Sequence, residues 1–148
     1  MLLAAPLLAG AATTVTVKVT VMAPPSCEIN GNRPIEVDFG EVMTTEINGS
    51  NYRKQVIYTL SCSGQTNSAM KLSIQGNGAA FDSSVLKTDK TGLGIQLQQG
   101  SNKLTLNSWL NFNLSSKPSL WAVPVKQSGV SLKGGEFSAA ATLKVAYQ

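Results

Sequence analysis

The 148-residue sequence contains no histidine, and only 14% of its residues are charged. A conventional Ser-His-Asp or Cys-His catalytic site is therefore excluded, and one of the usual zinc ligands is absent. The net charge is +4, but the cations are dispersed and their longest run is Arg53-Lys54. Nucleic-acid-binding surfaces generally need clustered cations, so the charge pattern argues against a nucleic-acid partner.

The carboxylates offer no better basis for catalysis. Glu36, Asp38 and Glu41 are the densest group. In an extended strand Glu36 and Asp38 share one face, Glu41 lies on the other, and the residues between them are apolar. This alternation predicts a solvent-facing strand surface. The short glycine motifs lack a following helix and do not resemble phosphate-binding loops. We therefore predict a protein that is not an enzyme and that uses no metal or cofactor.

Long amphipathic helices are also missing from the sequence, since no window of eleven or more residues shows a 3.6-residue apolar stripe. Turn signals such as Asn30-Gly31 and Asn48-Gly49 instead recur at short intervals. This spacing predicts an all-β antiparallel sandwich. The expected strands after the first are Ile35–Phe39, Val56–Ser61, Met70–Ile74, Leu93–Leu97, Leu104–Leu106, Leu120–Val125 and Phe137–Tyr147.

The first eleven residues are apolar and end in a small-residue pattern, Ala9-Gly10-Ala11. This is typical of a secretory signal with cleavage after Ala11 or Ala12, although the usual basic start is missing and the precursor would begin upstream. The alternative is a buried apolar segment of the domain. The rest of the sequence has no run of about 20 apolar residues, the length that a membrane-spanning helix needs.

The sequence has two cysteines, Cys27 and Cys62. An even number in an exported protein favours a disulfide, and with two the pairing is forced. The alternatives are two buried thiols or half of a metal site, and zinc needs about four ligands. For an exported protein, a disulfide between Cys27 and Cys62 is therefore the expected state.

The two ends of the chain both have strand-like patterns. From Phe137 to Tyr147 every second residue is apolar, and this pattern runs into the carboxyl terminus. Near the other end, Val15, Val17, Val19 and Val21 share one face of a second strand. This strand is either an ordinary first strand of the sandwich or an arm (residues 12–23) that Pro24-Pro25 separates from a domain at residues 24–148. The second interpretation describes a domain that is one strand short and is completed by another molecule.

Four aromatic residues could build a sugar-stacking surface: Trp109, Trp121, Tyr52 and Tyr58. Scattered aromatic side chains in a β domain more often serve in packing. The sequence does not bring these four together.

The chain resembles the pilin subunits of bacterial chaperone–usher fimbriae, and most of all their small tip and adaptor subunits. The resemblance covers nearly the whole mature chain. It rests on the valine-rich arm followed by Pro24-Pro25-Ser26-Cys27, on Val37-Asp38-Phe39-Gly40, on Tyr58-Thr-Leu-Ser-Cys62 and on Gly92-Leu-Gly94-Ile95-Gln96-Leu97. The most specific part is the end: Gly135, alternating apolar residues and the penultimate Tyr147.

The resemblance implies an incomplete immunoglobulin-like antiparallel sandwich lacking its last strand, with an N-terminal donor arm. A periplasmic chaperone would fill the gap first, and at the outer-membrane usher the arm of a neighbouring fimbrial subunit would replace it. The inserted side chains would be Val15, Val17, Val19 and Val21. The groove and the surface that the chaperone recognises would comprise Gly135, Phe137, Ala139, Ala141, Leu143, Val145, Tyr147 and Gln148, with cationic chaperone residues binding the terminal carboxylate.

By the same resemblance, the chain would pass through the periplasm to the cell surface and act as a minor pilin or adaptor in a fimbria. The alternative is a one-domain tip subunit that binds a host ligand directly. The chain departs from the family in one respect: it has no glycine between Thr13 and Met22, where the family commonly has one. We therefore expect this arm to need a larger acceptor pocket than usual.

Overall fold

A computed structural model describes residues 12–63 and 68–148. The predicted signal, residues 1–11, lies outside the described residues. The described residues form β-strands and three single-turn 3₁₀ helices, η1 (Asn30–Asn32), η2 (Thr44–Glu46) and η3 (Leu114–Ser116), and none of them is in an α-helix. No helix in this part of the chain is long and apolar enough to cross a membrane. The prediction of an all-β sandwich is therefore confirmed.

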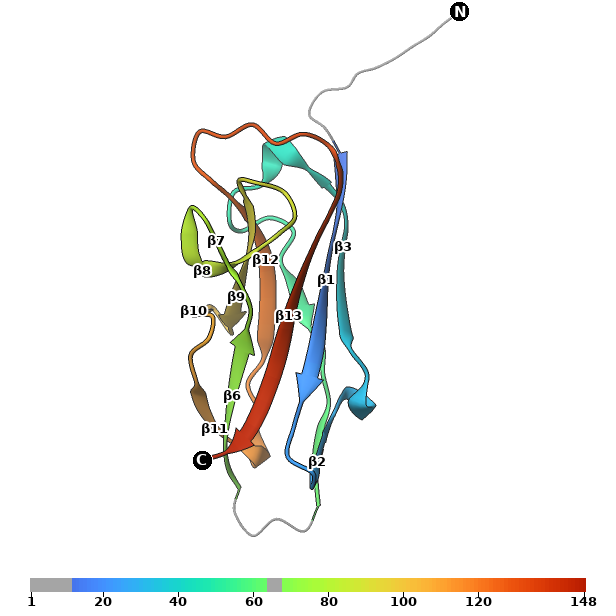
Figure 1. The fold of residues 1–148 in the computed structure, drawn as a ribbon, viewed down its shortest axis with the longest axis vertical. Coiled ribbons are helices and arrows are strands. Elements are labelled where there is room, and N and C mark those ends of the chain that lie inside the picture. The colour runs from blue at the N-terminus through green and yellow to red at the C-terminus, as the bar shows by residue number, and fades with distance from the viewer. Residues whose placement is uncertain (1–11, 64–67) are drawn as a thin grey trace, which may run out of the picture.

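One layer of the sandwich is a five-stranded sheet in the order β11-β6-β13-β1-β3. Its strands are β1 (Ala12–Met22), β3 (Ile35–Met43), β6 (Ala69–Gln75), β11 (Leu110–Asn113) and β13 (Gly135–Tyr147). In Figure 1 the blue strand from the N-terminal end lies side by side with the red strand from the C-terminal end. The two ends of the chain therefore meet inside one sheet.

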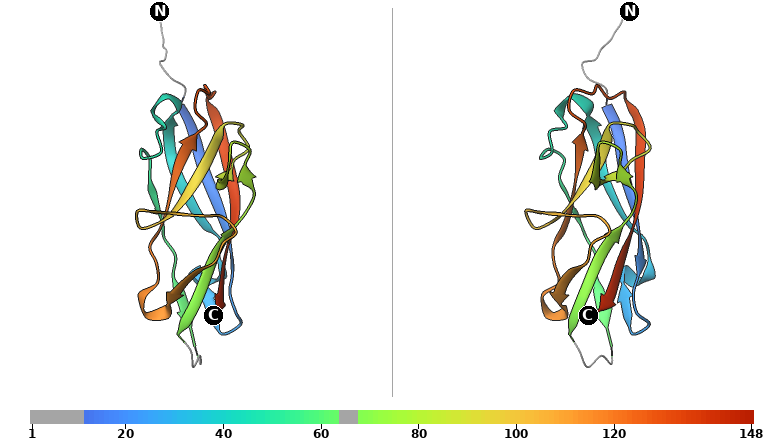
Figure 2. Two further views of the ribbon diagram at one scale, coloured as in Figure 1. Left: turned by 90° about the vertical axis from the view of Figure 1, so that its left-hand side faces the viewer. Right: turned by 60° about the vertical axis from the view of Figure 1, so that its left-hand side comes forward.

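The second layer is a six-stranded sheet in the order β4-β12-β9-β8-β7, with β10 paired to β9. Its strands are β4 (Lys54–Val56), β7 (Gly78–Ala79), β8 (Asp82–Lys87), β9 (Leu93–Gln99), β10 (Asn102–Leu104) and β12 (Leu120–Lys126). Figure 2 shows the two layers from the side. Apolar residues of both layers form one buried cluster, to which Leu72 and Leu143 contribute from the first sheet and Ile95 and Leu120 from the second.

A short third ladder joins β2 (Cys27–Ile29) to β5 (Leu60–Cys62). Cys27 and Cys62 are directly opposite each other in this ladder and form a disulfide with an S–S distance of 2.03 Å. The disulfide predicted from the cysteine count is therefore present. It lies next to the four-residue connection, Ala23–Ser26, that follows β1.

The predicted strand at Val56–Ser61 is divided in the structure. Its ends lie in β4 and β5, whereas Ile57 is 73% exposed between them. The backbone carbonyl of Tyr58 accepts from the Lys117 Nζ atom, and that of Thr59 accepts from the Asn30 amide. These partners outside the sheets satisfy the backbone where the strand is interrupted.

The alternation in β3 contains one irregularity that the sequence analysis did not predict. Glu36 and Asp38 are exposed, as expected, but so is Glu41, which strict alternation would place on the opposite face. The ladder with β1 shifts its register here, and Gly40 has a φ of +69°. An extra residue at a β-bulge resets the pattern, and glycine adopts this backbone conformation readily. As a result Val42 points back into the core.

Candidate functional site

The candidate site is the position of β1 between β3 and β13. We call β1 the arm, and we call the facing edges of β3 and β13 together the groove. The arm pairs with β13 in parallel over ten register positions, from Thr13 opposite Gly135 to Met22 opposite Lys144. On its other side it pairs antiparallel with β3 at seven positions. Since β3 and β13 are not neighbours in the sheet order, the arm is what joins them.

The inward face of the arm is deeply buried. Val15, Val17 and Val19 are exposed by 0%, 1% and 2%, and Val21 at the far end is half-buried. Thr13 lies on the same face, is also buried, and donates its hydroxyl hydrogen bond to the Gly135 carbonyl. The outward face, by contrast, is solvated and carries Lys18. The structure therefore brings all four predicted valines into the groove of their own chain.

The groove is formed by the predicted residues of the last strand. Phe137, Ala141, Leu143 and Val145 are buried, Ala139 and Tyr147 are half-buried, and Gly135 and Gln148 at the two ends are exposed. The centre of the groove is lined by small residues, because the register partners of Val17 and Val19 on β13 are Ala139 and Ala141. On β3 their partners are Val37 and Ile35. Two alanines thus leave room for an arm that has valine at both central positions.

The penultimate tyrosine fastens the end of β13 to the base of the arm. The Tyr147 hydroxyl is 2.5 Å from the Ser26 Oγ atom and 3.5 Å from the Cys27 Sγ atom. The following residue, Gln148, donates from its side-chain amide to the Met70 carbonyl over 2.7 Å. The disulfide, the arm connection and the C-terminus therefore meet at one end of the groove.

At the other end, the described residues provide no strand on the second side of β13 before Thr142. The ladder with β6 begins only at Thr142 opposite Gln75. Above it, Asp89 takes the place of a neighbouring strand: its amide donates to the Ser138 carbonyl over 3.0 Å, and its Oδ1 atom accepts from the Ser138 amide over 2.9 Å. Sequence analysis missed this residue, because one aspartate in a turn carries no pattern that points to a contact 49 residues away.

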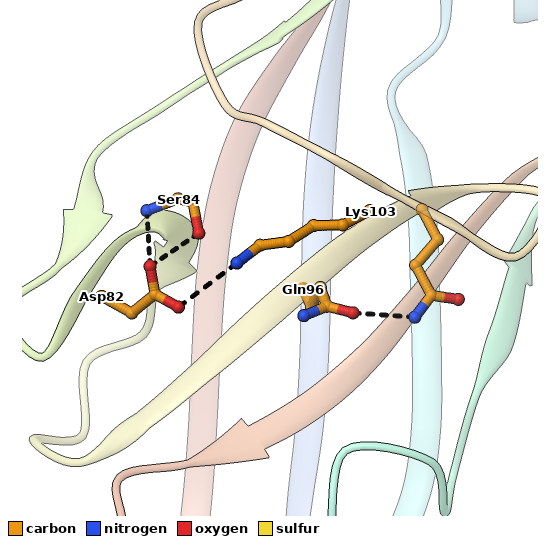
Figure 3. Close-up of polar contacts among 5 residues, drawn as sticks. Asp82, Ser84, Gln96 and Lys103 are labelled. Atoms are coloured by element: carbon orange, nitrogen blue, oxygen red, sulfur yellow. Dashed lines mark hydrogen bonds and ion pairs between the residues drawn. The ribbon is translucent and has the colours of Figure 1, made fainter.

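A second polar cluster lies on the other sheet, at the ends of β8 and β10 (Figure 3). The Asp82 Oδ1 atom accepts from the Ser84 hydroxyl over 2.6 Å and from the Ser84 amide over 3.0 Å, and Lys103 Nζ lies 3.4 Å from Oδ2. The hydrogen bonds from Ser84, assisted by the charge of Lys103, lower the pKa of Asp82 below its usual value. Because these charges pair with one another, the cluster has a structural role.

The two tryptophans considered for a sugar-stacking surface are associated with different sheets, and the Tyr52 hydroxyl accepts from the Met43 amide. Trp121 lies on β12 with the Arg53 guanidinium 4.0 Å from its ring centre, whereas Trp109 precedes β11 of the other sheet and is contacted by Lys71. Tyr58 is buried and donates to the Pro118 carbonyl over 2.6 Å, and burial raises the pKa of its hydroxyl. Packing against cations and carbonyls therefore accounts for these side chains.

Comparison with known proteins points to the same architecture. A family model described as fimbrial protein matches residues 15–148. The fimbrial-like proteins YfcR and YfcQ of Escherichia coli K12 are 38% and 40% identical over 136 and 135 residues. These matches cover 88% and 87% of this chain and 78% and 83% of the two relatives.

Among solved structures, the chain is similar to the P pilus adaptor subunit PapF, with a TM-score of 0.63 and 28% identity. The alignment covers 84% of this chain and 97% of that one. The family match, the relatives and the similarity to this immunoglobulin-like subunit agree with one another. The chain belongs to the fimbrial protein family.

Proposed function

We propose that the chain is a minor structural subunit of a fimbria, and that it polymerises by exchanging strands. Its groove receives a strand from a neighbouring subunit, and its arm enters the groove of another. The observation that carries this proposal is the position of β1, which fills the gap between β3 and β13 but is tied to the rest of the chain by only four residues, Ala23–Ser26.

The free energy of the inserted arm is large enough for a durable joint. Burial of Val15, Val17 and Val19 contributes about 1.5–3 kcal/mol for each side chain. Ordering of the arm opposes part of this gain. An empty groove would expose the edges of β3 and β13 together with apolar side chains, and such an edge promotes aggregation. Every stage of assembly therefore requires a strand in the groove.

The need for a strand in the groove at every stage defines the partners of the chain. In the proposed route a periplasmic chaperone supplies a strand to the groove, and the outer-membrane usher is where a neighbouring subunit's arm replaces it. Addition of a strand to a sheet edge provides main-chain hydrogen bonds and pockets for alternate side chains. Gln148 is exposed at the end of β13, which supports its proposed recognition by the chaperone. The completed subunit would reside in a fimbria on the cell surface.

A thermal melt tests the proposal. The oxidised body, residues 24–148, is melted alone and with an excess of a peptide of residues 12–22. We expect the body alone to melt far below the full chain or to aggregate, and the valine peptide to raise its melting temperature. A peptide carrying Val17→Asp is the control and should have no effect. If the body melts like the full chain without any peptide, the sheet is complete and the proposal fails.

A further inference from the structure

A cluster on the outward face of the first sheet lies outside both the core and the groove. It consists of Trp109, which directly precedes β11, Lys71 on β6 and Lys144 on β13, and these three strands are neighbours in the sheet (Figure 1). The Nζ atoms of Lys71 and Lys144 lie 4.5 Å and 5.9 Å from the centre of the Trp109 ring. One indole thus brings two ammonium groups together, and we call these three residues the tryptophan platform.

The indole lies across the sheet rather than standing away from it. Ser73 is on the outward face of β6, because the residues on either side of it point into the core, yet it is only 1% exposed. Its register partner on β13 is Lys144, and on the other side Trp109 directly precedes the register partner of Leu72. The indole and the lysine stems are therefore the side chains placed to cover Ser73. Even so, 43% of Trp109 remains exposed as an open apolar surface.

Two features of the platform are unfavourable in the chain by itself. Lys71 and Lys144 bring like charges to one ring, and neither forms an ion pair with a described residue. The only acidic residue on the three strands is Glu136, at the opposite end of β13. In addition, the Ser73 hydroxyl is buried without a hydrogen-bond partner, which costs free energy. A bound anion would supply the charge that this part of the sheet lacks.

The side chains around the platform favour a sugar as the carrier of that anion. The flat face of an indole packs well against the C–H groups of a pyranose ring. Asn111 is the register partner of Lys71, and Gln75 lies on the same face of β6 as Ser73, so that side-chain amides are present to bind hydroxyl groups. Because a cation–π contact at an exposed site is weak, either lysine can leave the ring and pair with a carboxylate or a sulfate.

An acidic protein segment fits this surface less well. The core of a protein interface is built from several aromatic and aliphatic side chains, whereas the platform has a single aromatic one. Of the other large apolar side chains that are exposed in the described residues, only Met22 belongs to this sheet, and β6 and β13 separate it from Trp109. The neighbouring outward positions Thr20 and Thr142 are polar. One aromatic ring in polar surroundings suits a sugar better than a protein.

We propose that the tryptophan platform binds an acidic saccharide, with a pyranose ring on the exposed surface of Trp109 and its carboxylate or sulfate between Lys71 and Lys144. This inference goes beyond the proposed function and does not depend on it, since the platform faces away from the core and is complete while the arm occupies its own groove. Because the platform is open and does not enclose its ligand, we expect weak binding by a single chain.

Tryptophan fluorescence of the oxidised full chain tests the proposal. The substitution Trp121→Phe leaves Trp109 as the only tryptophan. This chain is titrated with oligogalacturonate, which carries carboxylates, with heparin oligosaccharides, which also carry sulfates, and with neutral maltooligosaccharides. We expect a saturable change with at least one acidic sugar, and about tenfold weaker binding of the neutral sugar, which cannot pair with the lysines. Equal binding of the neutral sugar, or no binding of any acidic sugar, overturns the inference.

An acidic peptide is the second comparison in the same titration. Poly-glutamate offers carboxylates but no sugar ring to pack against Trp109, so it should bind more weakly than the acidic sugar that responds. If poly-glutamate binds as tightly, the platform takes an acidic protein segment and the assignment to a saccharide is wrong.

Two pairs of lysine substitutions separate binding at the platform from general attraction to a chain of net charge +4. Lys71→Gln with Lys144→Gln should weaken binding of the acidic sugar about tenfold, the effect of two exposed ion pairs. Lys54→Gln with Lys126→Gln removes the same charge from the second sheet, and should weaken binding by no more than about twofold. Trp109→Ala, measured by calorimetry, should abolish binding without lowering the melting temperature. If both lysine pairs act equally, or Trp109→Ala binds as the parent does, the inference is overturned.

Discussion

The pair β9–β12 and the pair β1–β13 are central to their sheets, but they depend on the chain in different ways. The first is antiparallel, has seven register positions and joins segments about 30 residues apart. The second is parallel, has ten positions and joins residues more than 120 apart, through a strand tethered at one end. One sheet is therefore built into the body, whereas the other contains a strand held by one short connection, which the proposed function treats as replaceable.

Introducing a charge at a buried position should give the largest difference between the β9–β12 pair and the β1–β13 pair. Ile95→Asp on β9 and Val17→Asp in the arm each place a carboxylate where the native side chain is at most 1% exposed. In β9 we expect the free energy of unfolding to fall by about 4 kcal/mol or more, so that the variant fails to fold. In the arm, the strand can leave the groove and carry its charge into water.

Limited proteolysis of the two variants measures this difference. Val17→Asp should be cut within residues 12–22 while residues 24–148 survive, provided that the groove is protected by the added peptide of residues 12–22. Ile95→Asp should be degraded throughout. Equal degradation of both variants would mean that the arm is as integral to the fold as β9.

Removal of the disulfide should have the next largest effect. Cys27→Ser with Cys62→Ser opens a link between residues 35 apart, and the chain-entropy estimate for a loop of this length is about 3–4 kcal/mol. Because the link lies beside the arm connection, its loss should also loosen the end of the groove. Urea unfolding gives the change in free energy, and hydrogen exchange should show faster opening at residues 13–22 than at residues 93–99. Equal acceleration at both segments would show that the disulfide acts on the whole sandwich.

The sequence predicted some strands of each sheet well and missed others. The strands with strong alternation or an apolar run, such as β9 and β13, lie close to their predicted bounds. β8 was missed because Asp-Ser-Ser-Val-Leu-Lys has neither pattern, and β11 because the alternation in Leu-Asn-Phe-Asn extends over only four residues. Both obtain their strand geometry from neighbours, which local propensity does not report.

The groove residues could be named from the alternation at Phe137–Tyr147, but their partner could not. Period-two patterns say which side chains share a face, not which strand lies beside them. Thus the sequence analysis placed Val15 to Val21 in a groove without establishing that the same chain could fill it. The direction of the arm follows from the four-residue connection, and the roles of Ser26 and Asp89 follow from contacts between distant residues.

Two tyrosine hydroxyls allow a finer comparison of the regions. Tyr147→Phe removes the hydroxyl that contacts Ser26 at the base of the arm, and Tyr58→Phe removes the one that donates to the Pro118 carbonyl. Each should cost about 1 kcal/mol, with the larger loss at Tyr58, where a buried carbonyl is left without its donor. Only Tyr147→Phe should also speed hydrogen exchange in the arm. If Tyr58→Phe does so equally, the two regions are coupled through the core.

The smallest expected effect concerns Asp82, which is distant from the arm in the sheet order. Its pKa is lower in the folded chain than its ordinary value because Ser84 and Lys103 favour the carboxylate. A lowered pKa contributes stability above the unfolded value of about 3.9, and this contribution is lost as the pH falls through the folded value. Asp82→Asn should therefore lower the melting temperature slightly at neutral pH, and the difference should shrink as the pH falls below about 3.9. The ion pair is largely solvated, because the side chains of Lys103 and Asp82 are 43% and 40% exposed. The difference in the free energy of unfolding between the two proteins should therefore stay below about 1 kcal/mol. Arm release, measured by proteolysis within residues 12–22, should be the same in both proteins at neutral pH, because the β8–β10 cluster belongs to the sheet that does not contain the arm.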